Sequence, residues 1–207
     1  MQTLNLEIFS RAGGPDAKEV EKNSRPWLVF LEGGCGGALI GKRTVLTAAH
    51  CGWKGNPRYV FVGEHDITME DGEEKYMVQS IFDHPNWGRG SDLGELTFAF
   101  DARMLILEKD VTLSQKVQIA ALPDKNEECK QFGHSMDVCG WGRTWKKCEE
   151  SSCDSIYPNK PMSLTYKCMD DIYCNKTFFG EFNICAGYPQ NAENSLCYGD
   201  SGGKKKC

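Results

Sequence analysis

Short runs of apolar and β-branched residues recur along the whole chain, separated by turn-forming glycine, proline, asparagine and aspartate. No stretch keeps the apolar spacing of an amphipathic helix over several turns. The pattern instead predicts β-strands at 27–31, 37–40, 44–48, 59–62, 76–82, 103–107, 136–140, 162–167 and 184–186. Many short strands at this spacing are typical of an all-β sandwich or barrel, and the pattern alone does not choose between the two.

The composition limits the class of protein further. The chain has 207 residues, of which 40% are hydrophobic, which is enough for one large β unit or two small barrels. Its formal charge is −5, and no Lys/Arg stripe is interleaved with aromatic residues, so we expect neither a nucleic acid nor a membrane surface as a partner. No run of 18 apolar residues is present, so we also expect no transmembrane helix.

Cysteine usage indicates the compartment. Eleven cysteines, with no CxxC pair and only four histidines, favour disulfides in an oxidising environment over a zinc site. We therefore expect a secreted, extracellular protein. The glycosylation sequon at Asn175 fits this expectation. Residues 1–10 lack the basic and apolar regions of a signal peptide, so we expect an incomplete or processed N-terminus.

Three motifs contain candidate catalytic residues. Ser201 lies in Gly-Asp-Ser-Gly-Gly, where glycines allow a tight turn whose N–H groups converge on one point. His50 lies in Leu-Thr-Ala-Ala-His-Cys, and Asp101 stands ahead of an apolar run; Asp92 is a weaker alternative because no apolar strand directly follows it. A serine hydroxyl needs a base within hydrogen-bond reach, and imidazole titrates in the right range. The motifs therefore predict a His-Asp-Ser triad.

These motifs, together with further segments in register, resemble the trypsin/chymotrypsin family of serine endopeptidases. The resemblance extends from about residue 13 to residue 207 and implies an all-β fold of two six-stranded antiparallel β-barrels, with the triad in the cleft between them. It implies a first barrel over about 13–113 and a second over 120–207, which we expect to be incomplete. The further matching segments are Gly13-Gly14, Pro26-Trp27, 35–40, 63–65, His84-Pro85, Leu122-Pro123, 140–142 and 185–187.

The resemblance also implies a role for each site residue. His50 is the general base, Asp101 orients it, and Ser201 is the nucleophile, while the N–H groups of Gly199 and Ser201 form the oxyanion hole. Ser195 lies at the floor of the specificity pocket, and its neutral side chain favours cleavage after Phe, Tyr or Leu. The implied partners are protein or peptide substrates and protein inhibitors.

Four cysteines match family disulfides, namely Cys35–Cys51 and Cys174–Cys185. The pairing of the other seven stays open, although Cys148 and Cys153 are near enough in sequence to pair and Cys139 is a candidate partner of Cys207. These seven are Cys129, Cys139, Cys148, Cys153, Cys168, Cys197 and Cys207.

The segment 64–74 resembles the calcium loop of trypsins, with Glu64 and Glu74 at its ends. Carboxylates and backbone carbonyls suit a hard cation, so calcium binding is one interpretation and an ordinary acidic surface loop is the other. We expect the chemistry itself to require no cofactor.

The chain departs from the family in several places. Arg11 stands where the family has the isoleucine that follows its activation site, Arg103 replaces a small alanine, and Lys204-Lys205-Lys206 replaces an apolar segment. The family also continues beyond Cys207 with strands that form one wall of the specificity pocket. Two functions therefore remain: an endopeptidase, and a non-catalytic homologue that acts as an extracellular binding or regulatory module. We expect these 207 residues alone to have little or no activity, and a chain with the further strands to cleave after Phe, Tyr or Leu.

Overall fold

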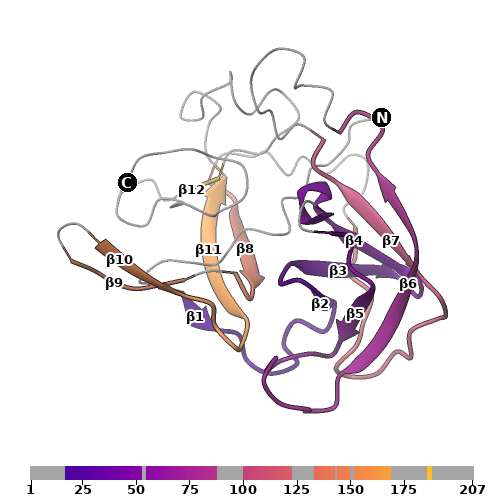
Figure 1. Cartoon of the computed structure of the whole chain (residues 1–207). Coiled ribbons are helices and arrows are strands. Elements are labelled where there is room, and N and C mark those ends of the chain that lie inside the picture. Colours follow the sequence, from indigo (N-terminus) through magenta and orange to yellow (C-terminus); the bar gives the residue numbers. More distant parts are fainter. Residues whose placement is uncertain are drawn as a thin grey trace.

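The computed structural model describes residues 17–52, 55–87, 100–122, 133–142, 144–149, 152–168 and 186–187. These residues form twelve β-strands and one turn of 3-10 helix (Figure 1). The first seven strands are β1 (Lys18–Glu19), β2 (Leu28–Leu31), β3 (Gly36–Gly41), β4 (Thr44–Thr47), β5 (Tyr59–Val62), β6 (Glu74–Asp83) and β7 (Arg103–Leu107), and the turn η1 (Ala49–Gly52) follows β4. The others are β8 (Ser135–Gly140), β9 (Thr144–Glu149), β10 (Ser152–Ile156), β11 (Met162–Cys168) and β12 (Ala186–Gly187).

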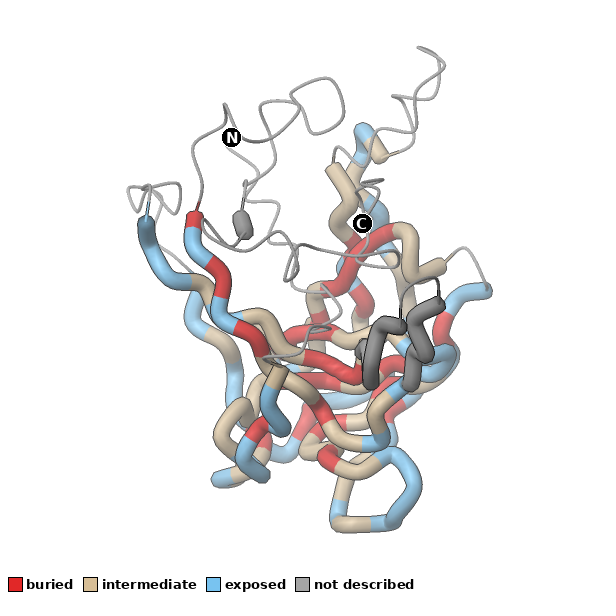
Figure 2. Tube along the Cα trace, turned by 90° about the vertical axis from the view of Figure 1, so that its left-hand side faces the viewer, coloured by how far each residue is buried: buried red, intermediate tan, exposed pale blue. Residues whose placement is uncertain are grey.

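Six strands close into an antiparallel barrel in the order β2-β3-β4-β7-β6-β5. Alternate residues of these strands point inward, as in β5, where Val60 and Val62 are buried and Tyr59 and Phe61 are not. The inward residues form one core cluster, which Figure 2 shows as buried segments along the barrel strands. The cluster contains Val29, Leu31, Leu39, Val45, Val60, Val62, Tyr76, Leu105, Leu107, Val111 and Val117. The barrel confirms the predicted all-β class and the six strands predicted in the first half of the chain.

Strands from the second half of the chain form, together with β1, a separate sheet beside the barrel. Strand β11 is at its centre and pairs antiparallel with β8, β1 and β12, and β9 and β10 form a hairpin (Figure 1). Its core is small, with Leu164 and Tyr166 buried. Among the residues that the structure describes, this half contains no second closed barrel.

Three strands were absent from the sequence prediction, for identifiable reasons. Strand β1 is two residues long and both are exposed, so it carries no apolar signal. The β9–β10 hairpin has the sequence TWKKCE…SCDSI, which lacks the alternation that predicts a half-buried strand. Its register places Cys148 opposite Cys153, but their disulfide stays a prediction. Within the described residues, no helix is long and apolar enough to cross a membrane.

Candidate active site

His50 lies on the turn η1, directly after the chain leaves the barrel wall at the end of β4. Cys51, in the same turn, forms a disulfide with Cys35, the residue directly before β3, with a Cα–Cα distance of 6.2 Å, which confirms the expected pairing. The two cysteines are 16 residues apart, and closing a loop of this size stabilises the folded chain by about 3 kcal/mol. The Thr47 hydroxyl also donates to the carbonyl of Gly36 at 2.9 Å. The turn that carries His50 is therefore fixed to the neighbouring strand.

Asp101 precedes β7 and binds His50 through both carboxylate oxygens. The backbone N–H of His50 donates to Oδ1 at 2.9 Å, and the ring Nδ1 lies 2.5 Å from Oδ2. The two side chains are 15% and 6% exposed, so the contact is shielded from water. Because Nδ1 is engaged by the carboxylate, Nε2 is the ring nitrogen that can accept a proton. This is the arrangement that a general base needs.

The residue before Asp101 has a strained backbone. Phe100 adopts φ = 62°, in the left-handed region that aromatic residues rarely occupy. Its ring stacks on His84 with the ring centroids 4.7 Å apart, and the N–H of His84 donates to the carbonyl of Ala102 at 2.8 Å. Backbone strain of this kind is found at functional sites, where surrounding contacts hold it in place. Here those contacts hold the two chain neighbours of Asp101, Phe100 and Ala102.

Other site residues predicted from the sequence lie outside the described residues. They are Ser201, Gly199, Ser195, Cys174 and Cys185. The described part of the site therefore consists of the candidate base and its carboxylate. The sulfur atoms of Cys35 and Cys51 also lie near the His50 ring, but they are joined in a disulfide and are not thiolate ligands for a metal.

A second cluster of ionisable groups lies in the loop between β5 and β6. One ligand oxygen each from Glu64, Asp71 and Glu73 lies within 4.8 Å of the others. The sequence predicted Glu74 in this place, but the cluster does not include it, and Glu74 accepts a hydrogen bond from the Tyr76 hydroxyl at 2.8 Å. The acidic residues in the sequence identified this loop as a candidate cation site. Which of their carboxylates lie close together depends on the folded backbone.

The acidic cluster has an unusual electrostatic environment. Burial and the neighbouring negative charge of Glu73 raise the pKa of Glu64 to about 7. Glu64 Oε1 and Asp71 Oδ1 are buried and have no hydrogen-bond partner among the described residues. The ammonium group of Lys22 lies 2.7 Å from the other oxygen of Asp71 and supplies part of the missing positive charge.

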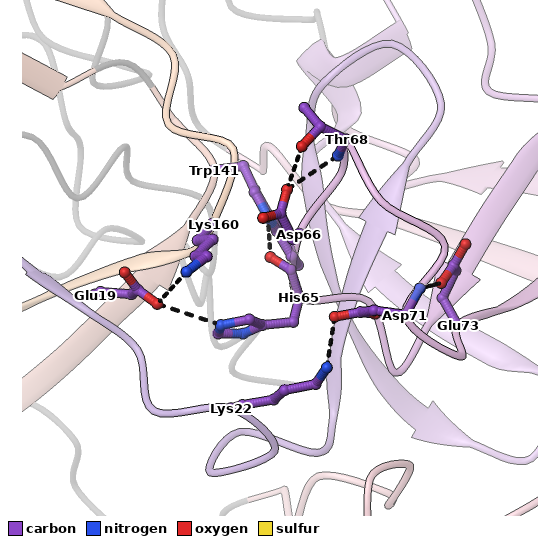
Figure 3. A network of polar contacts seen from close by, with 9 residues as sticks. All are labelled: Glu19, Lys22, His65, Asp66, Thr68, Asp71, Glu73, Trp141 and Lys160. Atoms are coloured by element: carbon purple, nitrogen blue, oxygen red, sulfur yellow. Dashed lines mark hydrogen bonds and ion pairs between the residues drawn. The ribbon is translucent and has the colours of Figure 1, made fainter.

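A polar network joins this loop to the second sheet (Figure 3). The Trp141 indole N–H donates to the carbonyl of His65 at 3.3 Å, and His65 Nε2 lies 3.5 Å from Glu19 Oε1. The same Glu19 oxygen lies 3.1 Å from the ammonium group of Lys160, and this hydrogen bond lowers the pKa of Glu19. Glu19 belongs to β1 and Trp141 follows β8, so both sheet strands are tied to the loop.

An antiparallel six-stranded barrel that presents a His–Asp pair at the end of its wall is typical of trypsin-like serine proteases. The trypsin family profile matches residues 15–204. The chain is 32% identical over 203 residues to chymotrypsin-like elastase family member 1 of Rattus norvegicus, with 94% of this chain and 72% of the relative covered. It is 32% identical over 192 residues to trypsin of Sus scrofa, with 89% and 75% covered. The chain therefore belongs to the trypsin family.

Solved structures share the fold at lower identity. Human heparin binding protein matches with a TM-score of 0.64 and 21% identity, covering 83% of this chain and 71% of its own. A mutant of the same protein matches with a TM-score of 0.69 and 22% identity, covering 90% and 77%. At this identity the likeness concerns the fold alone.

Proposed function

We propose that this chain is a serine endopeptidase that hydrolyses peptide bonds through His50, Asp101 and Ser201. The observation that carries the proposal is the contact between Asp101 and both the ring and the backbone of His50, at 2.5 and 2.9 Å. A carboxylate in this place selects the imidazole tautomer that can remove a proton from a serine hydroxyl. The Gly-Asp-Ser-Gly-Gly motif supplies that serine.

In the proposed reaction, Ser201 Oγ attacks the carbonyl carbon of the scissile bond and its proton passes to His50 Nε2. The N–H groups of Gly199 and Ser201 stabilise the oxyanion, and losing one such donor costs about 3–4 kcal/mol in the transition state. His50 then protonates the leaving amine, which leaves an acyl-enzyme. Water attacks the ester carbon and gives a proton to His50. The bond between the acyl carbon and Ser201 Oγ then breaks, His50 returns the proton to Oγ, and the acid leaves the free serine behind. Asp101 stabilises the imidazolium at each stage.

The same assignment predicts the substrates, the protein partners and the cellular compartment of the chain. Trypsin-like proteases act on proteins and are bound by protein inhibitors, and we propose both classes of partner for this chain. Neutral Ser195 at the pocket floor favours Phe, Tyr or Leu at the cleaved residue over Lys or Arg, which need a carboxylate there. Eleven cysteines support a secreted protein.

Calcium at the acidic loop is part of the proposal, because the family resemblance implies it and the residues fit. Glu64, Asp71 and Glu73 would hold the ion, since they bring three carboxylates together and two of their oxygens are buried with no hydrogen-bond partner in the described part of the chain. The bound ion would neutralise the cluster and stabilise the loop, with no part in bond cleavage. Lys22 competes with it for Asp71.

A fluorophosphonate probe tests the function directly, because it reacts only with an activated serine. In a chain that carries the family's further strands, we expect labelling at Ser201, with loss of labelling in Ser201→Ala and strong slowing in His50→Ala. Peptides with Phe, Leu, Arg or Lys at the cleaved residue then test specificity. If the folded chain with the further strands neither reacts with the probe nor cleaves any peptide, the non-catalytic binding module is favoured instead. A preference of that chain for Arg or Lys would contradict the pocket assignment.

A further inference from the structure

A buried arginine two residues after Asp101 has no part in the chemistry above. Arg103 begins β7 and is 6% exposed. It shares the inner face of the strand with Leu105 and Leu107, so its side chain lies at one end of the barrel interior. A guanidinium keeps its charge at all physiological pH values, and burying it is unfavourable unless its donors are paired.

The donors of Arg103 are paired with two different segments. Nε and Nη2 donate to the two carboxylate oxygens of Asp83 at 2.5 and 2.9 Å, which is a bidentate pair. Nη1 donates to the side-chain oxygen of Asn56 at 2.9 Å. Asp83 is the last residue of β6 and the cross-strand partner of Arg103, whereas Asn56 belongs to the loop that follows η1. The guanidinium therefore joins the barrel wall to that loop.

The same guanidinium lies directly against the turn that carries His50. A Cβ atom placed on Gly52 would meet Nη1 at 2.2 Å, Nη2 at 2.6 Å and Cζ at 2.7 Å. Gly52 is the last residue of η1, so any side chain there would force the guanidinium of Arg103 to move. The position of His50 thus depends on three contacts. Asp101 binds its ring and backbone, the Cys35–Cys51 disulfide fixes the next residue of the turn, and the guanidinium of Arg103 packs against the last residue of the turn.

We propose that Arg103 is a positioning residue for the His50–Asp101 pair. It fixes the end of the His50 turn to β6 and to the loop at Asn56, while its own backbone lies two residues from Asp101. The positions of His50 and Asp101 are thereby both fixed relative to the guanidinium of Arg103. The inference rests on the proposed endopeptidase function, and it goes beyond it by assigning a residue that the reaction itself does not touch. A buried ion pair is in itself weak evidence of a stabilising role, and the position of this one against the turn of His50 favours orientation as its function.

The test compares Arg103→Ala with Arg43→Ala. Arg43 is a matched control, because it clamps the other end of β7 by donating to the Leu107 carbonyl at 3.0 and 2.9 Å and to Gln79 at 2.8 Å. The main readout is the far-downfield NMR resonance of the His50 Nδ1 proton, which reports the ordered contact with Asp101 and needs no proteolytic activity. We expect Arg103→Ala to broaden or shift this resonance, and Arg43→Ala to leave it unchanged even where it lowers Tm.

Kinetics supply a second readout. We expect Arg103→Ala to lower kcat about 10- to 100-fold with little change in KM, since a misplaced base slows the chemical step rather than binding. Arg103→Lys should recover little of this loss, because an ammonium cannot make the bidentate pair and reach Asn56 as well. Asn56→Ala keeps the ion pair and removes only the contact to the loop, so it tests the proposal if Arg103→Ala does not fold, with a smaller effect of the same kind.

Several outcomes would overturn the proposal. These are a folded Arg103→Ala or Asn56→Ala with an unchanged His50 resonance, an equal effect of Arg43→Ala, or a wild-type chain without an ordered His50–Asp101 signal. The wild type could show the resonance, and Arg103→Ala lose it, while the wild type cleaves no peptide. In that case the endopeptidase function fails and the positioning role stands.

Discussion

At the scale of single residues, the Asp101 carboxylate binds the backbone and the ring of one residue, His50. The backbone bond fixes where the turn lies, and the ring bond fixes how the imidazole is oriented and which nitrogen carries its proton. The two functions are separable, because an amide in place of the carboxylate can keep the first and lose the second.

Asp101→Asn tests this separation. We expect kcat to fall about 10⁴-fold, the magnitude known for the same change in the chymotrypsin-type triad, because the amide stabilises the wrong tautomer. The asparagine oxygen still accepts the backbone N–H of His50, so Tm should change little. Comparison of kcat with thermal unfolding checks both parts. A fall in Tm as severe as in Cys35→Ala would contradict the separation, because it would mean that the amide does not keep the bond to the backbone N–H of His50.

Glu64 supplies the second residue-scale prediction, which concerns pH. Its pKa is about 7 in the folded chain against 4.5 ordinarily. Below pH 4.5 the carboxyl is protonated in both states and does not affect stability. Between pH 4.5 and 7 the unfolded chain loses the proton more readily, so the free energy of unfolding falls as pH rises, and the full penalty remains above pH 7.

Glu64→Gln should therefore raise Tm at pH 8 without calcium and leave it unchanged at pH 4.5. Glu64 is only partly buried, so solvent screening reduces the gain to about 1 kcal/mol, or about 2–4 °C for a chain of this size. Calcium at pH 8 should stabilise the wild type more than the variant. The exposed Glu70 of the same loop gives a matched control, Glu70→Gln, which should show neither effect. A gain at pH 4.5 equal to that at pH 8 would contradict the assignment.

At the scale of elements, the apolar pattern predicted the barrel strands well because each carries its own signal. In β5 and β7 every second residue is buried, and this alternation is visible in the sequence. The site was only partly predictable. His50 and Asp101 were found from their motifs, whereas the choice of Glu73 over Glu74 and the burial of Arg103 depend on loop and barrel-end geometry that no local pattern encodes.

The contact between η1 and β7 gives an element-scale prediction. Gly52→Ala should destabilise the wild-type chain by about 1–3 kcal/mol, because the new methyl group overlaps the guanidinium of Arg103. In an Arg103→Ala background the same change should cost much less. Urea unfolding of the four chains of this double-mutant cycle measures the coupling energy. Additive costs would mean that the two elements are not in contact there.

At the scale of the whole molecule, the barrel and the second sheet meet at Trp141. Its ring packs edge-on against Phe30 of β2 with centroids 5.3 Å apart, and its indole N–H donates to the His65 carbonyl. Trp141 is only 3% exposed, although it directly follows β8 in a sheet whose own core is small. Neighbouring contacts between the two halves are polar and more exposed, such as Arg25 with Asp137 at 3.1 Å.

Trp141 should therefore govern how cooperatively the two halves unfold. Trp141→Phe keeps ring packing and loses one hydrogen bond, so we expect a cost of about 1 kcal/mol and a single transition. Trp141→Ala removes the ring as well, at about 3–5 kcal/mol. Because the second sheet has little core of its own, it should then unfold at lower urea than the barrel, and two spectroscopic probes should no longer give coincident transitions. Hydrogen exchange of the backbone amides in β11 and in β5 would follow the two halves separately. Coincident transitions in Trp141→Ala would mean that the polar network of Glu19, His65 and Lys160 is enough to couple them.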